Sequence, residues 1–493
     1  MDTGIQEFFR NKTVFLTGGS GFLGKVVIEK LLRTTEVKRI YSLFRPKRGV
    51  SIGERVSVWE KDSIFEVLLK TKPDALQRVC PIAGDCQQPD LGLCELDKGL
   101  LVSEVQVVIH GAATVRFDEA MHLSLAINVR ATRLMLQLAK RMTQLVSFVH
   151  VSTAYSNSVA TDIDERFYPE HLRDGSDKIL ALGELLSAET IDNMTSALVG
   201  SFPNTYTYTK ALAEDVIRRE AGNLCIFRPS IIMPVCKEPE VGWTEGLNGP
   251  QALIFGIARG VVRVLTFDSN SKFNLVPVDY CANVILACAW TTGTNIGHAE
   301  KPPIYTFGST RKNQLCLKNF LELGFSFINR NPLNNVLWYP FLIRFPPLLF
   351  PFAAFFFHTL PGYFLDALLR LNGRKPILGK VYSKIHKNIA LLGPFMRTTF
   401  NFGMSNTQGL LETLSKKDRF MYDFDMDRLD WDHYFQGAFS GMRKHIANEP
   451  ITEESIASGL KLHRRFKVLH YGLTILLLSL ILYGLWMLAK FVF

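Results

Sequence analysis

Tyr206 and Lys210 lie four residues apart in a stretch with helical spacing, residues 204–220. This spacing places both side chains on one face of a helix. A neighbouring ammonium favours the phenolate and lowers the pKa of a tyrosine, which is normally near 10. We therefore expect the pair to deliver a proton to a carbonyl that receives a hydride, with the ammonium also holding a nicotinamide ribose. Tyr208 points elsewhere on the helix and is the weaker candidate acid.

Two hydroxyl residues, Ser152 and Thr153, follow a strand predicted over residues 145–151. Open parallel sheets place their ligand-contacting groups at the C-terminal ends of strands. A hydroxyl in that position can hydrogen-bond the substrate oxygen and share its developing charge. We expect one of the two to do so and favour Thr153, with strand-end capping as the alternative role.

A glycine-rich turn occupies residues 17–24 and joins a predicted strand to a predicted helix. Gly18 allows a tight turn, Gly21 lets backbone approach a pyrophosphate, and Gly24 lets the helix pack close to the strand. The free N–H groups at the helix N-terminus would then bind the phosphates. The residues predicted to bind the cofactor here are Thr17, Gly18, Ser20, Gly21, Phe22, Leu23 and Gly24.

Arg45 and Lys47 follow a second predicted strand, where an acid would bind a ribose 2′-hydroxyl and a cation suits a 2′-phosphate. No Asp or Glu occurs between the arginines at positions 39 and 48. We therefore expect NADPH rather than NADH, with a solvated basic loop as the alternative. After the next two strands, Asp85 is predicted to hydrogen-bond the adenine, and the small Ala112 and Ala113 let the cofactor lie close. An ordinary turn is the alternative for these three residues.

The elements that would position these residues alternate between strand and helix. Such alternation predicts a parallel sheet covered on both faces, hence an α/β, Rossmann-type doubly wound fold. The predicted strands are residues 13–16, 39–44, 78–83, 105–109, 145–151 and 224–227, and the predicted helices are 25–32, 53–70, 120–141 and 204–220.

Composition divides the rest of the chain. Residues 1–330 are predicted to form the NAD(P)-binding domain with a substrate-side extension, and residues 371–460 a C-terminal helical domain. Within the Phe- and Pro-rich connector, 331–370, residues 336–369 contain five prolines, Arg344 and Asp366, so we do not expect a simple membrane span there. A buried helical hairpin and a segment that dips into a membrane interface both remain open for it.

The last stretch predicts a membrane anchor over residues 469–489. Residues 471–488 contain no charge and have Leu or Ile at ten positions, which is long enough for one transmembrane helix. The basic stretch 463–467 precedes this helix and belongs on the cytosolic side. We therefore expect a single-pass C-terminal anchor on an intracellular membrane, with the body of the protein in the cytosol.

The composition of the 493 residues is that of a globular protein, and the net charge of +10 suits nucleic acid, a membrane surface or an anionic ligand. A basic arm and zinc-finger spacing are both lacking, so we expect no nucleic acid and no metal. The eight cysteines include no C-x-x-C pair, and several lie in apolar segments, which is typical of reduced cytosolic thiols.

Several longer strings resemble a known family. Residues 17–24, 149–155 and 206–210 are similar to the extended short-chain dehydrogenase/reductases. More narrowly, four strings resemble the alcohol-forming fatty acyl-CoA reductases, and the resemblance covers nearly the whole chain, including the C-terminal helical domain. These strings are residues 112–117 (AATVRF), 208–214 (YTKALAE), 228–231 (RPSI) and 275–279 (LVPVD).

The resemblance implies that a long-chain acyl-CoA is reduced to a primary alcohol by two NADPH through a bound aldehyde. It implies that Tyr206 and Lys210 are the catalytic pair and that Pro229 contacts the cofactor. It also implies membrane lipid as a partner and the endoplasmic reticulum or the peroxisome as the site, while chain length and oligomeric state stay open. The alternatives are another lipid- or sterol-directed extended short-chain dehydrogenase and an inactive, membrane-tethered NADPH-binding protein.

Overall fold

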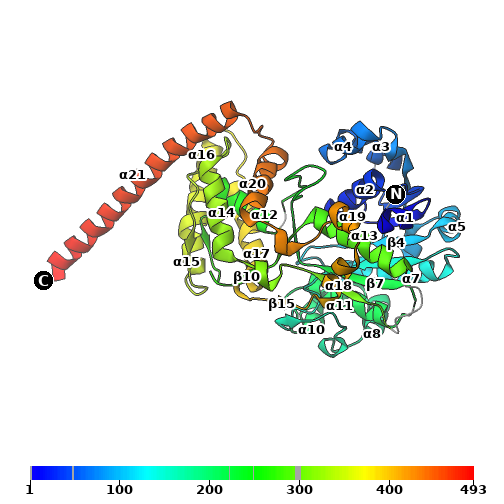
Figure 1. Cartoon of the computed structure of the whole chain (residues 1–493). Coiled ribbons are helices and arrows are strands. Elements are labelled where there is room, and N and C mark those ends of the chain that lie inside the picture. Colours follow the sequence, from blue (N-terminus) through cyan, green and yellow to red (C-terminus); the bar gives the residue numbers. More distant parts are fainter. Residues whose placement is uncertain (1–2, 47–48, 221, 248, 295–300, 493) are drawn as a thin grey trace. The chain divides into compact units, whose positions relative to one another are not determined.

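The computed structural model describes residues 3–46, 49–220, 222–247, 249–294 and 301–492 (Figure 1). The chain folds into two compact units. Unit 1 consists of Met1–Thr244, Lys272–Leu315 and Thr398–Asp430, and unit 2 of Glu245–Ser271, Cys316–Arg397 and Trp431–Phe493. This division differs from the consecutive segments predicted from composition, because each unit takes three separate pieces of the chain.

Unit 1 is built on a seven-stranded sheet in which every described pairing is parallel. The strand order is β12-β7-β5-β4-β1-β2-β3, so the chain reverses direction across the sheet between β1 and β4. The parallel sheet and its alternation with helices confirm the predicted Rossmann-type fold. The strands are β1 (Thr13–Thr17), β2 (Arg39–Phe44), β3 (Val79–Ala83), β4 (Val107–His110), β5 (Ser147–Val151), β7 (Leu224–Pro229) and β12 (Ile304–Phe307).

Helices cover both faces of this sheet. On one face, Phe148 of β5 joins a buried cluster with α5 (Glu95–Glu104), α7 (Ala131–Arg141) and α11 (Thr205–Arg218). The neighbouring Ser147 points to the other face, where its Cβ lies close to Gly293 of α13 (Val278–Thr294). Helix α13 also packs against α2 (Phe22–Thr34). Sheets buried on both faces need apolar strands, and β1, β4, β5 and β7 are buried along their whole length.

Two predicted helices differ in detail from the structure. The helix expected over 53–70 is broken into α3 (Ile52–Ser57), two 3₁₀ turns and α4 (Glu66–Thr71). At the break, Asp62 caps the second turn at the Ile64 N–H and forms an ion pair with Lys25 at 2.8 Å. The helix expected over 120–141 is present as α6 (Met121–Ser124), a π turn (Leu125–Arg130) and α7.

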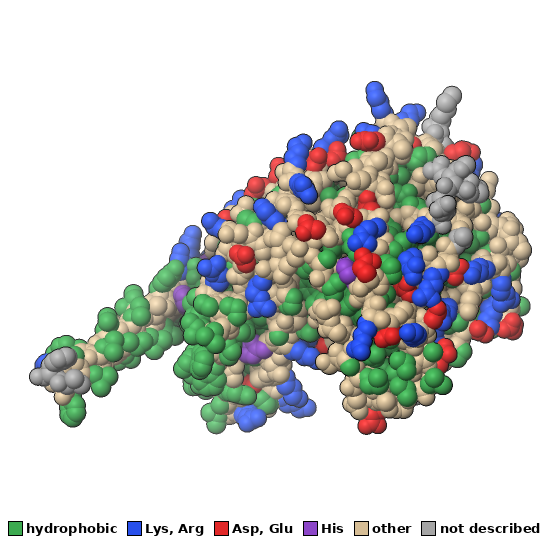
Figure 2. Space-filling model, turned by 90° about the horizontal axis from the view of Figure 1, so that it is seen from below, with side chains coloured by type: hydrophobic (Ala, Val, Ile, Leu, Met, Phe, Trp, Pro, Cys, Tyr) green, Lys and Arg blue, Asp and Glu red, His purple; other side chains and the backbone are tan. Residues whose placement is uncertain are grey.

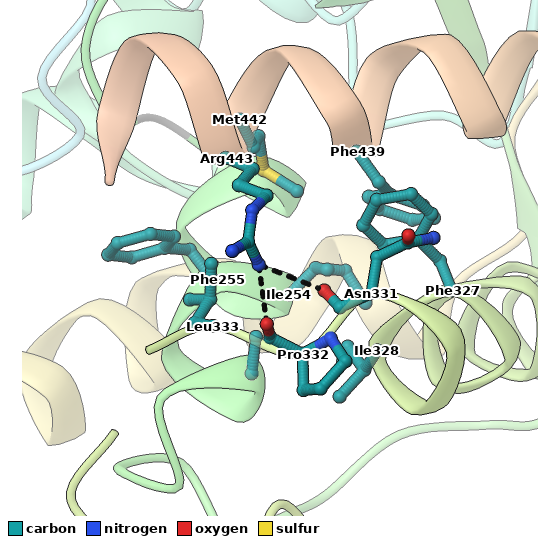
Figure 3. A pocket seen from close by; sticks show the side chains of 11 residues that line it. Ile254, Phe255, Phe327, Ile328, Asn331, Pro332, Leu333, Phe439, Met442 and Arg443 are labelled. Atoms are coloured by element: carbon teal, nitrogen blue, oxygen red, sulfur yellow. Dashed lines mark hydrogen bonds between the residues drawn. The ribbon is translucent and has the colours of Figure 1, made fainter. Parts of the chain in front are cut away.

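Unit 2 is mainly helical in its described part, as predicted for the C-terminal region. Its helices are α12 (Gly249–Ala258), α14 (Leu317–Arg330), α15 (Phe350–Ala354), α16 (Leu360–Leu371), α17 (Leu378–Arg397), α20 (Trp431–Gly441) and α21 (Glu453–Val492). Figure 3 shows an apolar hollow among α12, α14 and α20, into which Arg443 reaches to donate to the carbonyls of Asn331 and Pro332. Its volume of about 20 Å³ is room for little more than one water.

Among the described residues of unit 2, two helices are long and apolar enough to cross a membrane. The first is Glu453–Phe491, in whose most apolar window no residue is buried, and the second is Phe350–Leu371, in whose window 28% of the residues are buried. The predicted anchor, 469–489, lies inside the first. Tyr471 and Trp486 lie near the ends of its charge-free part, where interfacial aromatic residues are enriched in membrane helices.

Candidate active site

The glycine turn between β1 and α2 is as tight as its sequence predicts. Gly18 has a φ of +79°, and a Cβ there would lie 2.8 Å from the backbone of Gly111. A Cβ on Gly24 would lie 2.2 Å from the carbonyl oxygen of Gly18. Both positions therefore require glycine, which brings the start of α2 against the end of β1.

Gly21 differs from these two glycines because it is exposed and a Cβ there would lie at an ordinary contact distance, 3.4 Å, from the Gly18 carbonyl oxygen. It is the N-cap of α2, and among the described residues no side chain caps this helix end. The first N–H groups of α2 therefore remain available to an anion. Ser20, Phe22 and Leu23 are half-buried around the same turn, and the Phe22 ring stacks on Trp243 at 5.5 Å.

Thr17 connects the ends of β1 and β4. Its Oγ1 accepts a hydrogen bond from the Ala112 N–H at 3.1 Å and lies 2.8 Å from Nδ1 of the buried His110. This bond holds Ala112, and with it Ala113, beside the glycine turn. Both alanines are half-buried, so the structure places these predicted contact residues at one edge of the sheet.

Arg45 and Asp85 lie together at the ends of the paired strands β2 and β3. The Arg45 Nε is 3.7 Å from Oδ2 of Asp85, and the Arg45 side chain is 64% exposed. The Asp85 Oδ1 accepts the N–H of Gln87, which is a turn-forming contact. Lys47, the other predicted phosphate-binding residue, lies outside the described residues.

Helix α11 carries the predicted catalytic pair, and Asn204 caps its N-terminus, with its side chain accepting the Thr207 N–H. Lys210 is 2% exposed, and its Nζ donates to the carbonyl of Val151 at 2.7 Å. Burial lowers the pKa of Lys210 to about 8, and the carboxylate of Glu214 opposes this shift. The side chain is therefore mostly a cation at pH 7, at the C-terminal end of β5.

Tyr206 is half-buried on the same helix, with its ring stacked on Phe117 at 5.9 Å. Burial raises the pKa of Tyr206 to about 12, and a hydrogen bond with Thr153 opposes the rise. The predicted lowering of this pKa by Lys210 is therefore wrong. The physical reason is that desolvation of the phenolate outweighs the favourable contacts, while the Lys210 Nζ is engaged with Val151. A neutral phenol is still the form that can donate a proton.

The two strand-end hydroxyls have different surroundings. Ser152 Oγ donates to Oε1 of Glu214 at 2.6 Å, and both residues are buried. Thr153 Oγ1 makes only a long contact of 3.5 Å to the Pro229 carbonyl and accepts the Tyr155 N–H, besides its hydrogen bond with Tyr206. The hydroxyl of Thr153 is thus next to the candidate acid, while that of Ser152 is committed to a carboxylate.

Glu214 belongs to a buried network that sequence reasoning missed. The guanidinium of Arg228, fully buried, donates to both carboxylate oxygens of Glu214 and to the carbonyls of Asp164 and Arg166. The spacing of four residues between Lys210 and Glu214 is the signal that could have indicated it. The network fixes the ends of β5 and β7, where Thr153 and Pro229 lie.

Asn128 was also missed. It lies in the π turn before α7, its side chain bonds both the N–H and the carbonyl of Thr114, and it donates to Thr209 Oγ1 at 2.9 Å. It thereby ties the loop after β4 to the helix that carries Tyr206. Such π turns are frequent at functional sites.

Comparison with known proteins gives consistent matches. Models of a family described as "Male sterility protein" match residues 16–285 and 357–449. The chain is 37% identical over 489 residues to "Fatty acyl-CoA reductase wat" of Drosophila melanogaster, covering 99% of this chain and 93% of that protein. It is 34% identical to "Fatty acyl-CoA reductase 1" of Xenopus laevis, covering 97% of this chain and 92% of that protein.

Two solved structures share the fold. One is the terminal R domain from the myxalamid PKS-NRPS biosynthetic pathway, with a TM-score of 0.56 and 19% identity over 88% of this chain and 91% of that one. The other is a reductase (R) domain of a nonribosomal peptide synthetase from Mycobacterium tuberculosis, with a TM-score of 0.54 and 16% identity over 90% of this chain and 96% of that one. At these identities the likeness concerns the fold alone.

Proposed function

The chain belongs to the family of fatty acyl-CoA reductases, within the extended short-chain dehydrogenase/reductases, and we propose that it reduces a long-chain acyl-CoA to a primary alcohol and free CoA. The proposal includes two NADPH per acyl chain and an aldehyde that stays bound between the two reductions. One observation supports the proposal most directly. The glycine turn, the phenol of Tyr206, the ammonium of Lys210 and the hydroxyl of Thr153 all lie at the same edge of a parallel sheet.

The residues at this edge fit a nicotinamide cofactor, which supplies the hydride when bound. The N–H groups at the start of α2 would hold the pyrophosphate, since only glycine fits at Gly18 and Gly24 and no side chain among the described residues caps the helix. Arg45 would bind the 2′-phosphate, because its exposed guanidinium lies at the end of β2. Asp85 would reach the adenine, and Lys210 the ribose of the nicotinamide.

Tyr206 would act as the proton donor. Its raised pKa keeps it neutral at pH 7, and the carbonyl oxygen of the substrate gains negative charge as the carbon gains hydride. Thr153 would donate a second hydrogen bond to that oxygen. Lys210, with a pKa of about 8, is mostly an ammonium at pH 7, so it would stabilise negative charge that develops beside it.

The two reductions balance as follows. In the first, a C–H bond forms at the thioester carbon, the C–S bond breaks, and CoA leaves as a thiolate that takes a proton from water. The product is an aldehyde. In the second, the aldehyde carbon gains a second hydride and its oxygen gains a proton from Tyr206, which completes the alcohol.

Residues 469–489 of α21 would anchor the protein in an intracellular membrane, either of the endoplasmic reticulum or of the peroxisome. Support comes from the exposed, charge-free part of this helix and from its basic flank, which belongs on the cytosolic side. An anchor of this kind suits the substrate, since a long acyl chain partitions into lipid.

The decisive experiment follows NADPH oxidation by the full chain with palmitoyl-CoA and identifies the product by mass spectrometry. Two NADPH consumed per alcohol formed is the expected result. Accumulation of free aldehyde with one NADPH consumed would contradict the two-step reaction. NADPH binding without turnover of acyl-CoA of any chain length would instead favour the inactive, tethered protein, and turnover of a hydroxysteroid would favour a sterol dehydrogenase.

A further inference from the structure

The helix Phe350–Leu371 of unit 2, which joins α15, a π turn and α16, has an exposed apolar side. We call this side the aromatic face, and define it by Phe352, Phe355, Phe356, Leu360, Tyr363 and Phe364, which are between 49% and 66% exposed. Figure 2 shows hydrophobic side chains gathered on unit 2 beside α21. Contiguous exposed apolar surface of this kind marks an interaction site.

The opposite side of the same helix is fixed to unit 2 along its length. Ala354, His358, Gly362 and Asp366 recur every four residues and are all buried. His358 Nε2 accepts the Arg263 N–H at 2.9 Å, and Asp366 accepts the N–H groups at the start of α17. A Cβ on Gly362 would lie 2.7 Å from the ring of Tyr382. The helix therefore cannot be surrounded by lipid without losing buried polar contacts.

Charge around the aromatic face is almost entirely positive. Within residues 336–397 the one acidic residue is Asp366, which is committed to capping α17. A second copy of the chain docking on this face would bring like charges together, whereas an anionic bilayer surface would neutralise them. The exposed basic residues in this range are Arg344, Arg370, Arg374, Lys375, Lys380, Lys384, Lys387 and Arg397.

The aromatic face also lies within short reach of the predicted anchor. Trp338 Nε1 hydrogen-bonds His470 of α21 at 3.2 Å, and the Phe341 ring stacks on the same histidine at 4.6 Å. His470 directly precedes the charge-free part of α21. The Phe341 ring also lies 6.1 Å from the ring of Phe357, which belongs to the helix that carries the aromatic face. The aromatic face thus begins close to the point where α21 would enter a bilayer.

We propose that the aromatic face rests in the interface of an anionic bilayer, with the helix Phe350–Leu371 parallel to the membrane plane. It forms a second membrane contact beside α21, and the basic residues of α17 bind lipid phosphates and carboxylates. The inference depends on the proposed anchoring by α21. It resolves the open interpretation of the connector in favour of an interface-dipping segment. The second contact fixes the tilt of unit 2, which a single membrane helix leaves free.

The test measures membrane depth in the full chain. A fluorescent amino acid replaces Phe352, Leu360 or Leu371 in turn, and vesicles carry lipid quenchers either near the headgroup or at the tail end. A helix of 22 residues is about 33 Å long, so a spanning orientation would place position 360 deep and the other two shallow. The expected result is equal, shallow quenching at all three positions. A label at Leu480 of α21 should be deep, and one at Leu96, which is 81% exposed in unit 1, should not be quenched.

Each other outcome identifies a different failure. Quenching of position 360 by the tail-end quencher would mean that the helix spans the bilayer. If none of the three positions is quenched while Leu480 is quenched by the tail-end quencher, protein covers the aromatic face. An unquenched Leu480 would overturn the anchor itself, and this inference with it.

A matched pair of charge variants tests the lipid preference. We expect Lys380→Gln with Lys384→Gln to raise the fraction of phosphatidylserine needed for half-maximal quenching at position 360. Lys416→Gln with Lys417→Gln, an exposed pair in unit 1, should leave that fraction unchanged. Equal behaviour of the two double variants would contradict the proposed role of α17.

Discussion

Replacing Tyr206 with phenylalanine isolates the phenolic proton. The ring and its stacking on Phe117 are retained, and the hydroxyl with its hydrogen bond to Thr153 is lost. Loss of one such bond costs about 0.5–1.5 kcal/mol in stability, so the variant should fold and should bind NADPH nearly as well as the parent.

The size of the catalytic effect follows from the state of the phenol. With a pKa of about 12, only about one Tyr206 in 10⁵ is ionised at pH 7, so nearly every molecule holds the proton that the reaction needs. Loss of a positioned general acid lowers turnover by about 10²–10⁴, which corresponds to about 2.7–5.4 kcal/mol of transition-state stabilisation. KM for palmitoyl-CoA should change much less than kcat.

Single-turnover measurement of NADPH oxidation, together with NADPH affinity from fluorescence, separates chemistry from binding. Tyr208→Phe is the matched control, because Tyr208 also lies on α11, where it is buried and packs edge-on against Phe202. It should retain nearly full activity. Activity of Tyr206→Phe within about threefold of the parent, or an equal loss in both variants, would refute the assignment of Tyr206 as the acid.

Five further changes test the rest of the site and the anchor. Arg45→Ala should weaken NADPH binding by about ten- to a hundredfold, which is the contribution of a charge-assisted hydrogen bond, and should leave NADH affinity almost unchanged. An equal loss of affinity for both cofactors would mean that Arg45 has a structural role. Lys210→Ala should impair both NADPH affinity and turnover. In the parent protein, kcat should fall as the pH rises through about 8, because the Lys210 ammonium is then lost. A kcat of the parent that stays constant up to pH 10 would contradict the catalytic role of this ammonium. Thr153→Val should lower kcat by more than tenfold with little effect on stability. Ser152→Ala should mainly lower the melting temperature, since it leaves Glu214 without one hydrogen-bond donor. A comparable loss of kcat in both variants would contradict a specific role of Thr153. Deleting residues 469–493 should let carbonate release the protein from membranes, and continued resistance would mean that the segment Phe350–Leu371 is embedded rather than interfacial.

Local rules explain which parts of the site were predictable. The glycine turn was predictable, because the role of each glycine depends on its immediate neighbours along the chain and on the strand and helix that flank it. Helical spacing likewise placed Tyr206 and Lys210 on one helix. The pKa of Tyr206 was not predictable, because it depends on burial by distant segments rather than on the four-residue spacing.

Contacts between distant segments explain the rest. The sequence shows two adjacent hydroxyls after β5, but only the fold reveals that Glu214 takes one of them and leaves Thr153 beside Tyr206. The division of the chain into two units could not be predicted from the sequence either. The strands β6 (Asp162–Ile163) and β15 (Asn401–Phe402) that join the last piece of unit 1 to the rest have two residues each, too few for a periodic pattern.

That pairing has a consequence for the order of events during synthesis. Asn401 bonds Asp162, which was made 239 residues earlier, so the ribosome must deliver nearly the whole chain before unit 1 can close. Until then Glu165, which accepts hydrogen bonds from Thr306, Asn406 and Thr407, lacks two of these three partner residues. The apolar helices of unit 2 up to α17 emerge during this interval. A nascent chain in this state exposes apolar surface and an unfinished fold together, which is the condition under which chaperones are needed.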